Sequence, residues 1–210
     1  MPTFYEKLVW ANGDGAGLRV NDTAIGKIGM LICGENTNPL ARYSLIAQGE
    51  QVHISSYPPV WPTRPSNEPG RYDLASAIRI RAGAHSFEGK VFNIVSSGFL
   101  DKRAIEALRG IDREGLETLE QSPQGVSMVI GPSGEIISDT LCDSEGLLYQ
   151  EIDISRCVEP KQFHDIVGYY NRFDVFDLKV TRKRLASIEF SDDPAEQVSA
   201  ADDSSDSLVS

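Results

Sequence analysis

Cys33 is the residue whose type and position most clearly indicate chemistry. It ends the apolar run 29–33 and precedes a short turn that begins with Gly34. Asn38 and Pro39 then fit an N-cap and a first helical position, so we expect a helix from there to about residue 48. A cysteine between a strand and a helix points its sulfur away from the sheet, and the helix N-terminus favours the thiolate. This pattern predicts a thiol nucleophile; the alternative, equally favoured by these residues alone, is an inert buried cysteine.

A nucleophile of the Cys–His type needs a histidine beside the sulfur, and the chain offers three. His53 lies in a predicted strand well beyond the cysteine turn, and His85 lies on a predicted helix. Neither of them, nor His164, belongs to a Cys–His signature around Cys33. We therefore expect the histidines to be structural, with His164 also a candidate for the substrate pocket through the C-terminal segment.

Two aromatic residues, Tyr57 and Trp61, lie at the start of the proline-rich segment 58–69. One interpretation has them lining a substrate pocket near the nucleophile. The other, equally supported, is a surface loop whose aromatic side chains pin it to the protein.

Residues 33–54 closely resemble the nucleophile segment of the nitrilases, which belong to the carbon–nitrogen hydrolase superfamily. The segment runs from Cys33-Gly34-Glu35-Asn36 to Gly49-Glu50-Gln51-Val52-His53-Ile54. Four other segments share the resemblance: Pro2-Thr3-Phe4-Tyr5-Glu6-Lys7, Gly13-Asp14-Gly15, Ser56-Tyr57-Pro58-Pro59-Val60-Trp61-Pro62 and Gly168-Tyr169-Tyr170-Asn171-Arg172-Phe173-Asp174. Together they cover about residues 1–180.

The resemblance implies a catalytic set of one cysteine, one lysine and two glutamates. Cys33 matches the nucleophile, Glu6 matches the supporting glutamate, and the backbone N–H of Gly34 is implied as a donor in the oxyanion hole. The family's lysine would fall just ahead of Met1 and its base glutamate further upstream, while Lys7 lies on the wrong side of Glu6 to replace the lysine. We therefore expect an N-terminally incomplete nitrilase whose isolated chain has little or no activity.

The reaction implied by the resemblance is nitrile plus water to carboxylic acid plus ammonia through a cysteine thioimidate, with no metal or organic cofactor. Gly34 replaces a tryptophan that is common in relatives, so substrate preference does not transfer from a relative that carries it. Alternatives are a cyanide hydratase, an amidase, or a catalytically silent assembly subunit. The expected partners are a small-molecule nitrile and further copies of the chain, as a dimer or a spiral.

Composition narrows the remaining classes of function. The net charge of −11 argues against binding to nucleic acid or to an anionic membrane. No apolar run approaches the roughly 18 residues of a membrane span, and the N-terminus lacks a secretory signal, so a cytoplasmic location is expected. The three cysteines show neither a disulfide framework nor a metal-ligand spacing. Cys142 and Cys157 are expected to be structural.

The predicted elements alternate between strands and helices. We expect strands at 18–20, 24–33, 51–57, 91–97, 126–130, 136–138 and 147–152, with a turn at Asn21-Asp22 and a terminal strand or arm at 173–180. Helices are expected at 40–48, 74–88, 102–108, 114–119 and 155–167. This order predicts an α/β protein, and the resemblance implies the αββα sandwich of the nitrilases. Residues 1–190 are expected to form a partial carbon–nitrogen hydrolase domain, and the Ser-, Ala- and Asp-rich residues 191–210 a disordered acidic tail.

Overall fold

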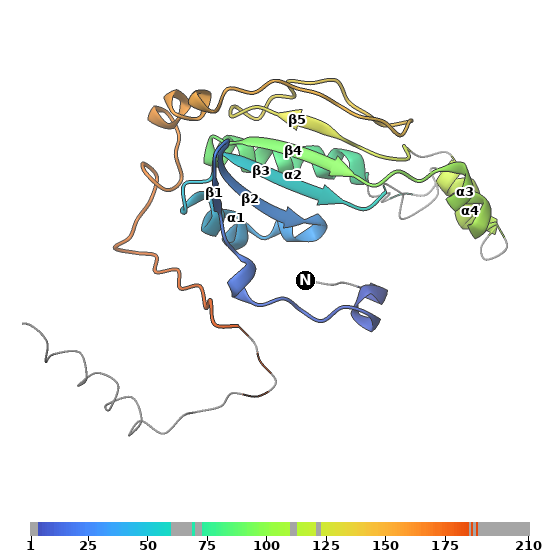
Figure 1. The fold of residues 1–210 in the computed structure, drawn as a ribbon, viewed down its shortest axis with the longest axis horizontal. Coiled ribbons are helices and arrows are strands. Elements are labelled where there is room, and N and C mark those ends of the chain that lie inside the picture. The colour runs from blue at the N-terminus through green and yellow to red at the C-terminus, as the bar shows by residue number, and fades with distance from the viewer. Residues whose placement is uncertain are drawn as a thin grey trace, which may run out of the picture.

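The computed structural model describes residues 4–59, 69, 73–109, 113–120, 123–184, 186 and 188. Its centre is a five-stranded mixed sheet in the strand order β1-β2-β3-β4-β5 (Figure 1). β2, β3 and β4 are parallel, and β1 and β5 pair antiparallel to their neighbours at the two edges. The strands are β1 (Asn21–Thr23), β2 (Gly26–Ile32), β3 (Val52–Tyr57), β4 (Phe92–Ser97) and β5 (Met128–Ile130).

Two helices connect the parallel strands and lie against one face of the sheet. They are α1 (Pro39–Ile46) and α2 (Leu74–Gly89), and α3 (Lys102–Leu108) and α4 (Arg113–Glu120) form a separate pair. Short 3₁₀ turns complete the elements: η1 (Phe4–Leu8), η2 (Gly15–Gly17), η3 (Cys33–Thr37), η4 (Ile154–Cys157) and η5 (Glu159–Gln162). The parallel strands and their crossover helices confirm the predicted α/β fold.

Side chains at the N-caps explain where three of the helices begin. The Asn38 side chain accepts hydrogen bonds from two N–H groups of α1, and Pro39 is its first residue. Asp73 and Asp101 accept in the same way at the starts of α2 and α3. Each cap satisfies backbone donors that have no partner within the helix. These local signals are why the helices begin close to their predicted positions.

The core cluster lies between α2 and the sheet. Its buried members are Tyr57, Ile78, Ala82, Val95, Val126, Met128 and Ile130. The opposite face of the sheet is apolar but more open: Met30 and Ile32 on β2 keep 52% and 59% of their surface exposed. Met30 lies in register with Ile54, and Ile54 with Ile94, so apolar side chains continue across three strands. The described residues thus supply one sheet and one helical layer of the expected αββα sandwich.

Several predicted elements differ from the structure. The first hairpin turns at Ala24-Ile25, not at Asn21-Asp22, because the Thr23 hydroxyl accepts from the Ile25 N–H and donates to the Gly26 carbonyl. Residues 147–152 form no strand, because no strand in the described part of the chain pairs with them. Residues 173–180 form no strand either, which leaves the alternative of an arm. The helix predicted at 155–167 is replaced by η4 and η5, because Pro160 has no N–H to continue it.

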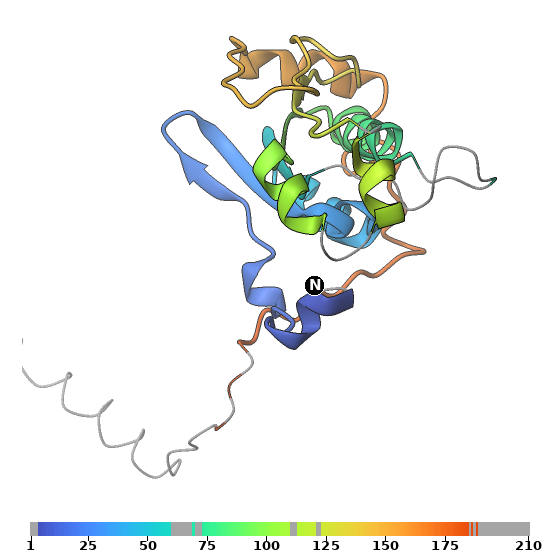
Figure 2. The ribbon, with the colours of Figure 1, turned by 90° about the vertical axis from the view of Figure 1, so that its right-hand side faces the viewer.

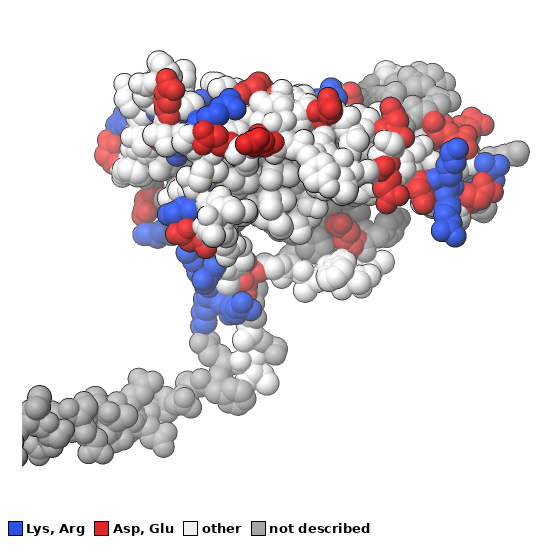
Figure 3. Space-filling view, turned by 45° about the horizontal axis from the view of Figure 1, so that its top comes forward, with Lys and Arg blue, Asp and Glu red and all other residues white. Residues whose placement is uncertain are grey.

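The predicted acidic tail, residues 191–210, lies outside the described residues, as does Trp61. In the part of the chain that is described, no helix has the length and apolar character that crossing a membrane requires. On the face shown in Figure 3, Asp and Glu side chains are spread over several elements and do not form one patch.

Candidate active site

Cys33 directly follows β2 as the first residue of η3, and its backbone is strained. Its φ of +48° places it in the left-handed region, which only Cys33 and Lys90 share among the described non-glycine residues. A residue with a Cβ atom loses about 1–2 kcal/mol in that region. Such strain at the turn from a strand into a helix is typical of a nucleophile elbow, which lifts the reactive atom off the sheet. Cys33 is half-buried and packs against the core cluster.

Tyr57 lies at the same edge of the sheet as Cys33. β2 and β3 are parallel, so their carboxyl ends meet, and Cys33 directly follows β2 while Tyr57 ends β3. Tyr57 is buried within the core cluster against which Cys33 packs. The Arg81 guanidinium lies 6.0 Å from the centre of its ring. The structure therefore brings the predicted nucleophile and one predicted pocket residue together.

Gly34 is exposed beside the nucleophile. Apart from its two chain neighbours, no described residue has an atom within 4 Å of a Cβ atom built on Gly34, so this position next to Cys33 is open in the described part of the chain. This agrees with the extra room that the sequence indicates at this position. The proposed donation by its N–H stays a prediction.

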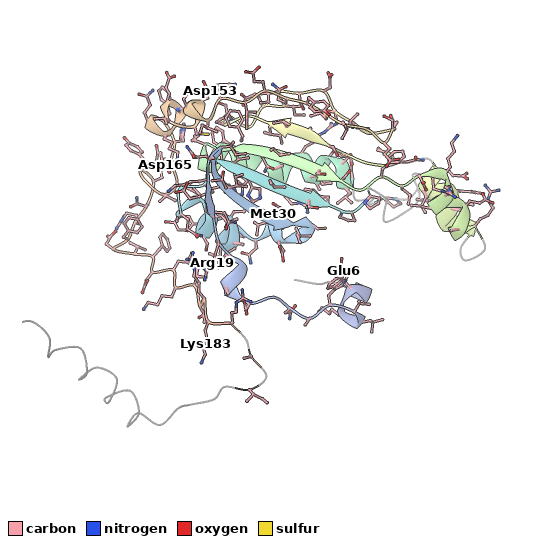
Figure 4. All side chains as sticks on the ribbon, in the orientation of Figure 1. Glu6, Arg19, Met30, Asp153, Asp165 and Lys183 are labelled. Carbon is pink, nitrogen blue, oxygen red and sulfur yellow. The ribbon has the colours of Figure 1, made fainter. Side chains whose placement is uncertain are left out.

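Glu6 lies on η1, in a part of the chain that stands below the sheet in both ribbon views (Figures 1 and 2). Its side chain is exposed, and Figure 4 shows it on η1, away from the sheet. Its role as the supporting glutamate stays a prediction.

The structure separates His164 from Cys33 along the length of α2. The His164 ring lies 5.8 Å from the ring of Phe87, near the C-terminal end of the helix. Leu74, at the N-terminal end, packs with Cys33 against the core cluster. Phe87 follows Leu74 by thirteen residues, which at about 1.5 Å per residue amounts to about 20 Å. His164 is close in sequence to the family-like segment 168–174, but the structure does not bring it to the nucleophile.

A buried polar network lies beneath the elbow. Glu50, His53 and His85 are each at most 1% exposed. One Glu50 carboxylate oxygen lies 2.7 Å from His53 Nδ1, and the other lies 2.7 Å from His85 Nε2. The two imidazole rings stack with their centres 3.9 Å apart. The histidines therefore have a shared carboxylate partner that sequence reasoning did not identify.

The protonation of this network follows from its contacts. Burial by itself would raise the pKa of Glu50, but the hydrogen bonds and charge interactions with His53 and His85 together outweigh it, and the pKa lies below its ordinary value. Burial lowers the pKa of His85, although its hydrogen bond to Glu50 opposes this. We therefore describe Glu50 as ionised and His85 as neutral, with the Nε2–H of His85 donating to the carboxylate.

The same three side chains are the described group whose ligand atoms come close enough for a metal ion, all lying within 4.8 Å of one another. Both carboxylate oxygens, however, already accept short hydrogen bonds from the imidazoles. A buried carboxylate that is paired in this way needs no metal to offset its desolvation. Hydrogen bonds alone are thus sufficient to account for the arrangement.

The side chains of Glu35 and Arg42 hold η3 against its neighbours through three contacts. The Glu35 carboxylate accepts from the Ile32 N–H at 3.0 Å. The Arg42 guanidinium donates to the Asn36 carbonyl at 3.0 Å and pairs with Glu88 of α2 at 3.0 Å. The turn that carries Cys33 is therefore tied to β2, α1 and α2.

Cys157 differs from Cys33 in its surroundings. It is buried, and burial raises the pKa of its thiol, although a backbone hydrogen bond from the Phe92 N–H and nearby cations oppose this. A protonated, enclosed thiol is a poor nucleophile, which agrees with a structural role.

A family model described as carbon–nitrogen hydrolase matches residues 1–162. The chain belongs to the carbon–nitrogen hydrolase family. It is 31% identical over 200 residues to a nitrilase of Penicillium rubens, covering 92% of this chain and 59% of that protein. It is 32% identical over 199 residues to an arylacetonitrilase of Fusarium vanettenii, covering 89% and 58%. The chain thus spans somewhat more than half the length of these curated relatives.

Two solved structures share the fold of this carbon–nitrogen hydrolase. A carbon–nitrogen hydrolase from Helicobacter pylori G27 matches with a TM-score of 0.62 at 23% identity, over 81% of this chain and 54% of that one. Nit3 of Saccharomyces cerevisiae, described as a member of the nitrilase superfamily, matches with a TM-score of 0.55 at 16% identity, over 82% and 52%. At these identities the likeness concerns the fold, which is the nitrilase-type α/β fold expected from the sequence.

Proposed function

We propose that Cys33 is the nucleophile of a nitrilase reaction that converts a nitrile and water into a carboxylic acid and ammonia. The observation that carries the proposal is the positive φ of Cys33 at the carboxyl end of a central parallel strand. In open α/β sheets this edge is where reactive groups and ligands gather. The nitrilase relatives support a nitrile as the substrate class.

The proposed reaction proceeds through a covalent intermediate. The Cys33 sulfur attacks the nitrile carbon, so that a C–S bond forms, one C–N π bond breaks and the nitrogen gains a proton, giving a thioimidate. Water then adds to the carbon, the nitrogen leaves as ammonia, and a second water releases the acid and restores the thiol. The Gly34 N–H donates to the nitrogen as negative charge develops on it. The family resemblance gives Glu6 the role of orienting the lysine and water or of relaying protons, and in the structure Glu6 is exposed on η1, away from the sheet, so this role stays a prediction. Tyr57, buried beside Cys33, is the described candidate for lining the substrate pocket.

We propose that residues 1–210 by themselves release little ammonia, because they hold no counterpart of the lysine and base glutamate that the family resemblance implies. The test compares residues 1–210 with the same residues fused behind the upstream part of the Penicillium rubens nitrilase, on a panel of aliphatic and arylacetonitriles. The fused chain should release ammonia and lose this activity in Cys33→Ala. Strong turnover by residues 1–210 that depends on Cys33 would refute the need for the upstream groups. Turnover that survives Cys33→Ala would refute the nucleophile assignment.

Product analysis separates nitrilase chemistry from its relatives. A thioimidate that has taken up water can expel ammonia, which leads to the acid, or expel the thiolate, which leads to the amide. Acid and ammonia in equal amounts support the proposal. Amide as the main product from a nitrile, or formamide from cyanide, would favour a hydratase, and hydrolysis of amides alone would favour an amidase.

An assembly subunit is the second candidate, and the apolar sheet face favours it. Met30 and Ile32 leave a large share of their surface exposed on the face opposite α1 and α2. Such a face gains stability when another layer covers it. Residues 1–210 should then bind the full-length Penicillium rubens nitrilase in sedimentation velocity, without turnover of their own, and Met30→Lys should weaken this binding. Absence of binding, or turnover that depends on Cys33, would count against this candidate.

A further inference from the structure

We propose that Asn36 is the positioning residue that holds Cys33 in its strained conformation, and that the Glu50–His53 pair fixes the orientation of the Asn36 amide. This inference rests on the proposed role of Cys33 as nucleophile. The Cys33 backbone is strained because its φ is positive, so contacts are needed to keep the sulfur at the edge of the sheet.

The Asn36 side chain forms hydrogen bonds with backbone carbonyls before and after the φ torsion of Cys33. Its Nδ2 group donates to the Leu31 carbonyl at 3.1 Å and to the Cys33 carbonyl at 3.2 Å. Asn36 is 1% exposed, so water does not compete for these bonds. One amide group therefore ties Leu31, near the end of β2, to the carbonyl of Cys33, and the two bonds span the φ torsion of Cys33.

The other end of the amide is fixed from β3. Asn36 Oδ1 lies 3.1 Å from the Ser55 hydroxyl and 3.0 Å from His53 Nε2. Because the Nδ2 group faces two carbonyl oxygens, which only accept, the oxygen of the amide must face His53 and Ser55. His53 Nε2 must then carry a proton. If the amide were flipped, Asn36 Oδ1 would face the carbonyl oxygens of Leu31 and Cys33, and none of these oxygens can donate a hydrogen bond.

Glu50 completes the chain of hydrogen bonds. Its carboxylate lies 2.7 Å from His53 Nδ1, the second nitrogen of the ring whose Nε2–H holds Asn36. It also accepts from His85, which anchors the carboxylate to α2. Gly29 of β2 leaves room for this, since a Cβ atom there would lie 1.9 Å from Glu50 Oε1. The Cys33 backbone is thus connected through Asn36 and His53 to a carboxylate held between sheet and helix.

Two pairs of variants distinguish this role from simple packing. Asn36→Asp keeps the shape of the side chain but removes the donor that holds the two carbonyls. Glu50→Ala removes the anchor of His53. Glu50→Gln restores it when His53 releases its Nδ1 proton to solvent: the glutamine N–H then donates to Nδ1, the Nε2–H still donates to Asn36, and the glutamine oxygen accepts from His85. Glu50→Gln also removes the negative charge, so a role that depended on charge would not survive this change.

The measurement is the intraresidue NOE from the amide proton to Hα, which is strong when φ is positive. Cys33 should give this signal in the unchanged chain and in Glu50→Gln, and should lose it in Asn36→Asp and Glu50→Ala. Lys90, with φ of +53° and no bond to Asn36, is the internal control and should keep its signal in all four chains. Retention of the Cys33 signal in Asn36→Asp, or equal loss in Glu50→Gln and Glu50→Ala, would overturn the proposal.

A second measurement needs no variant. The Asn36 side-chain NH₂ protons should exchange with solvent far more slowly than those of an exposed amide, and rapid exchange would overturn the proposal. A stoichiometric divalent metal ion in the purified chain would also overturn it, because the ion would replace the shared protons. Iodoacetamide tests the nucleophile separately: an unreactive Cys33 with a positive-φ signal would refute the proposed function and leave the positioning role intact.

Discussion

Gly29→Ala should destabilise the chain because β2 passes directly over the buried Glu50 carboxylate. The added Cβ would lie 1.9 Å from Oε1 and 2.8 Å from Cδ of Glu50, so the carboxylate must move. Overpacking of this kind costs about 1–3 kcal/mol. Movement also weakens hydrogen bonds to a charged group, which are worth about 1.5–3 kcal/mol each. We expect a loss of about 3 kcal/mol in the free energy of unfolding when one such bond is largely lost.

Urea and thermal unfolding measure this loss. For a chain of this size about 1 kcal/mol corresponds to a shift of about 2–4 °C, so the Tm should fall by about 6–12 °C. Gly34→Ala is the matched control: its Cβ has open space, so its free energy of unfolding should change by less than about 0.5 kcal/mol. In the Glu50→Ala background the cost of Gly29→Ala should largely disappear, since the clashing group is gone. An unchanged cost in that background would refute the assignment of the clash to Glu50.

Three further predictions follow from the described contacts. Stability should fall as pH decreases from 7 to 4. The pKa of His85 is lowered from 6.5, so the unfolded state takes up a proton first as pH falls below that value. The pKa of Glu50 is lowered from 4.5, so the unfolded state also takes up a proton before the folded state as pH falls below 4.5. A Tm that stays constant from pH 7 to pH 4 would contradict the expectations for His85 and for Glu50. Asp73→Ala should cost about 1 kcal/mol in urea unfolding, whereas Asp73→Asn should cost less, because the asparagine still accepts from the Ser76 N–H at the start of α2. Cys157 should react with iodoacetamide only as fast as the chain unfolds, and labelling at the rate of an exposed thiol would contradict its burial.

The helices could be predicted from sequence because their signals are local. Asn38-Pro39, Asp73 and Asp101 each lie within three residues of the N–H groups that they cap. The central strands were also predicted well, since they are short apolar runs bounded by turn residues.

The wrong predictions have different causes. Residues 147–152 have strand-like composition, but a strand forms only where another strand accepts its hydrogen bonds, and that partner is not a local signal. The first hairpin shifted by a few residues because hydrogen bonds of the Thr23 hydroxyl stabilise the turn, and hydrophobic periodicity does not report them. The helix expected at 155–167 is interrupted at Pro160, a local signal that the sequence itself contains.

The family and the α/β class could be inferred from sequence alone, because motifs and hydrophobic periodicity are local signals. The same local signals predict Cys33 as the nucleophile. The surroundings of that cysteine could not be inferred in this way, because they depend on tertiary packing. Glu50 and His85 are 35 residues apart and meet through the packing of α2 on the sheet, and His164 lies near the far end of the same helix. Which polar groups share a buried space follows from how the layers pack, and spacing along the chain does not report it.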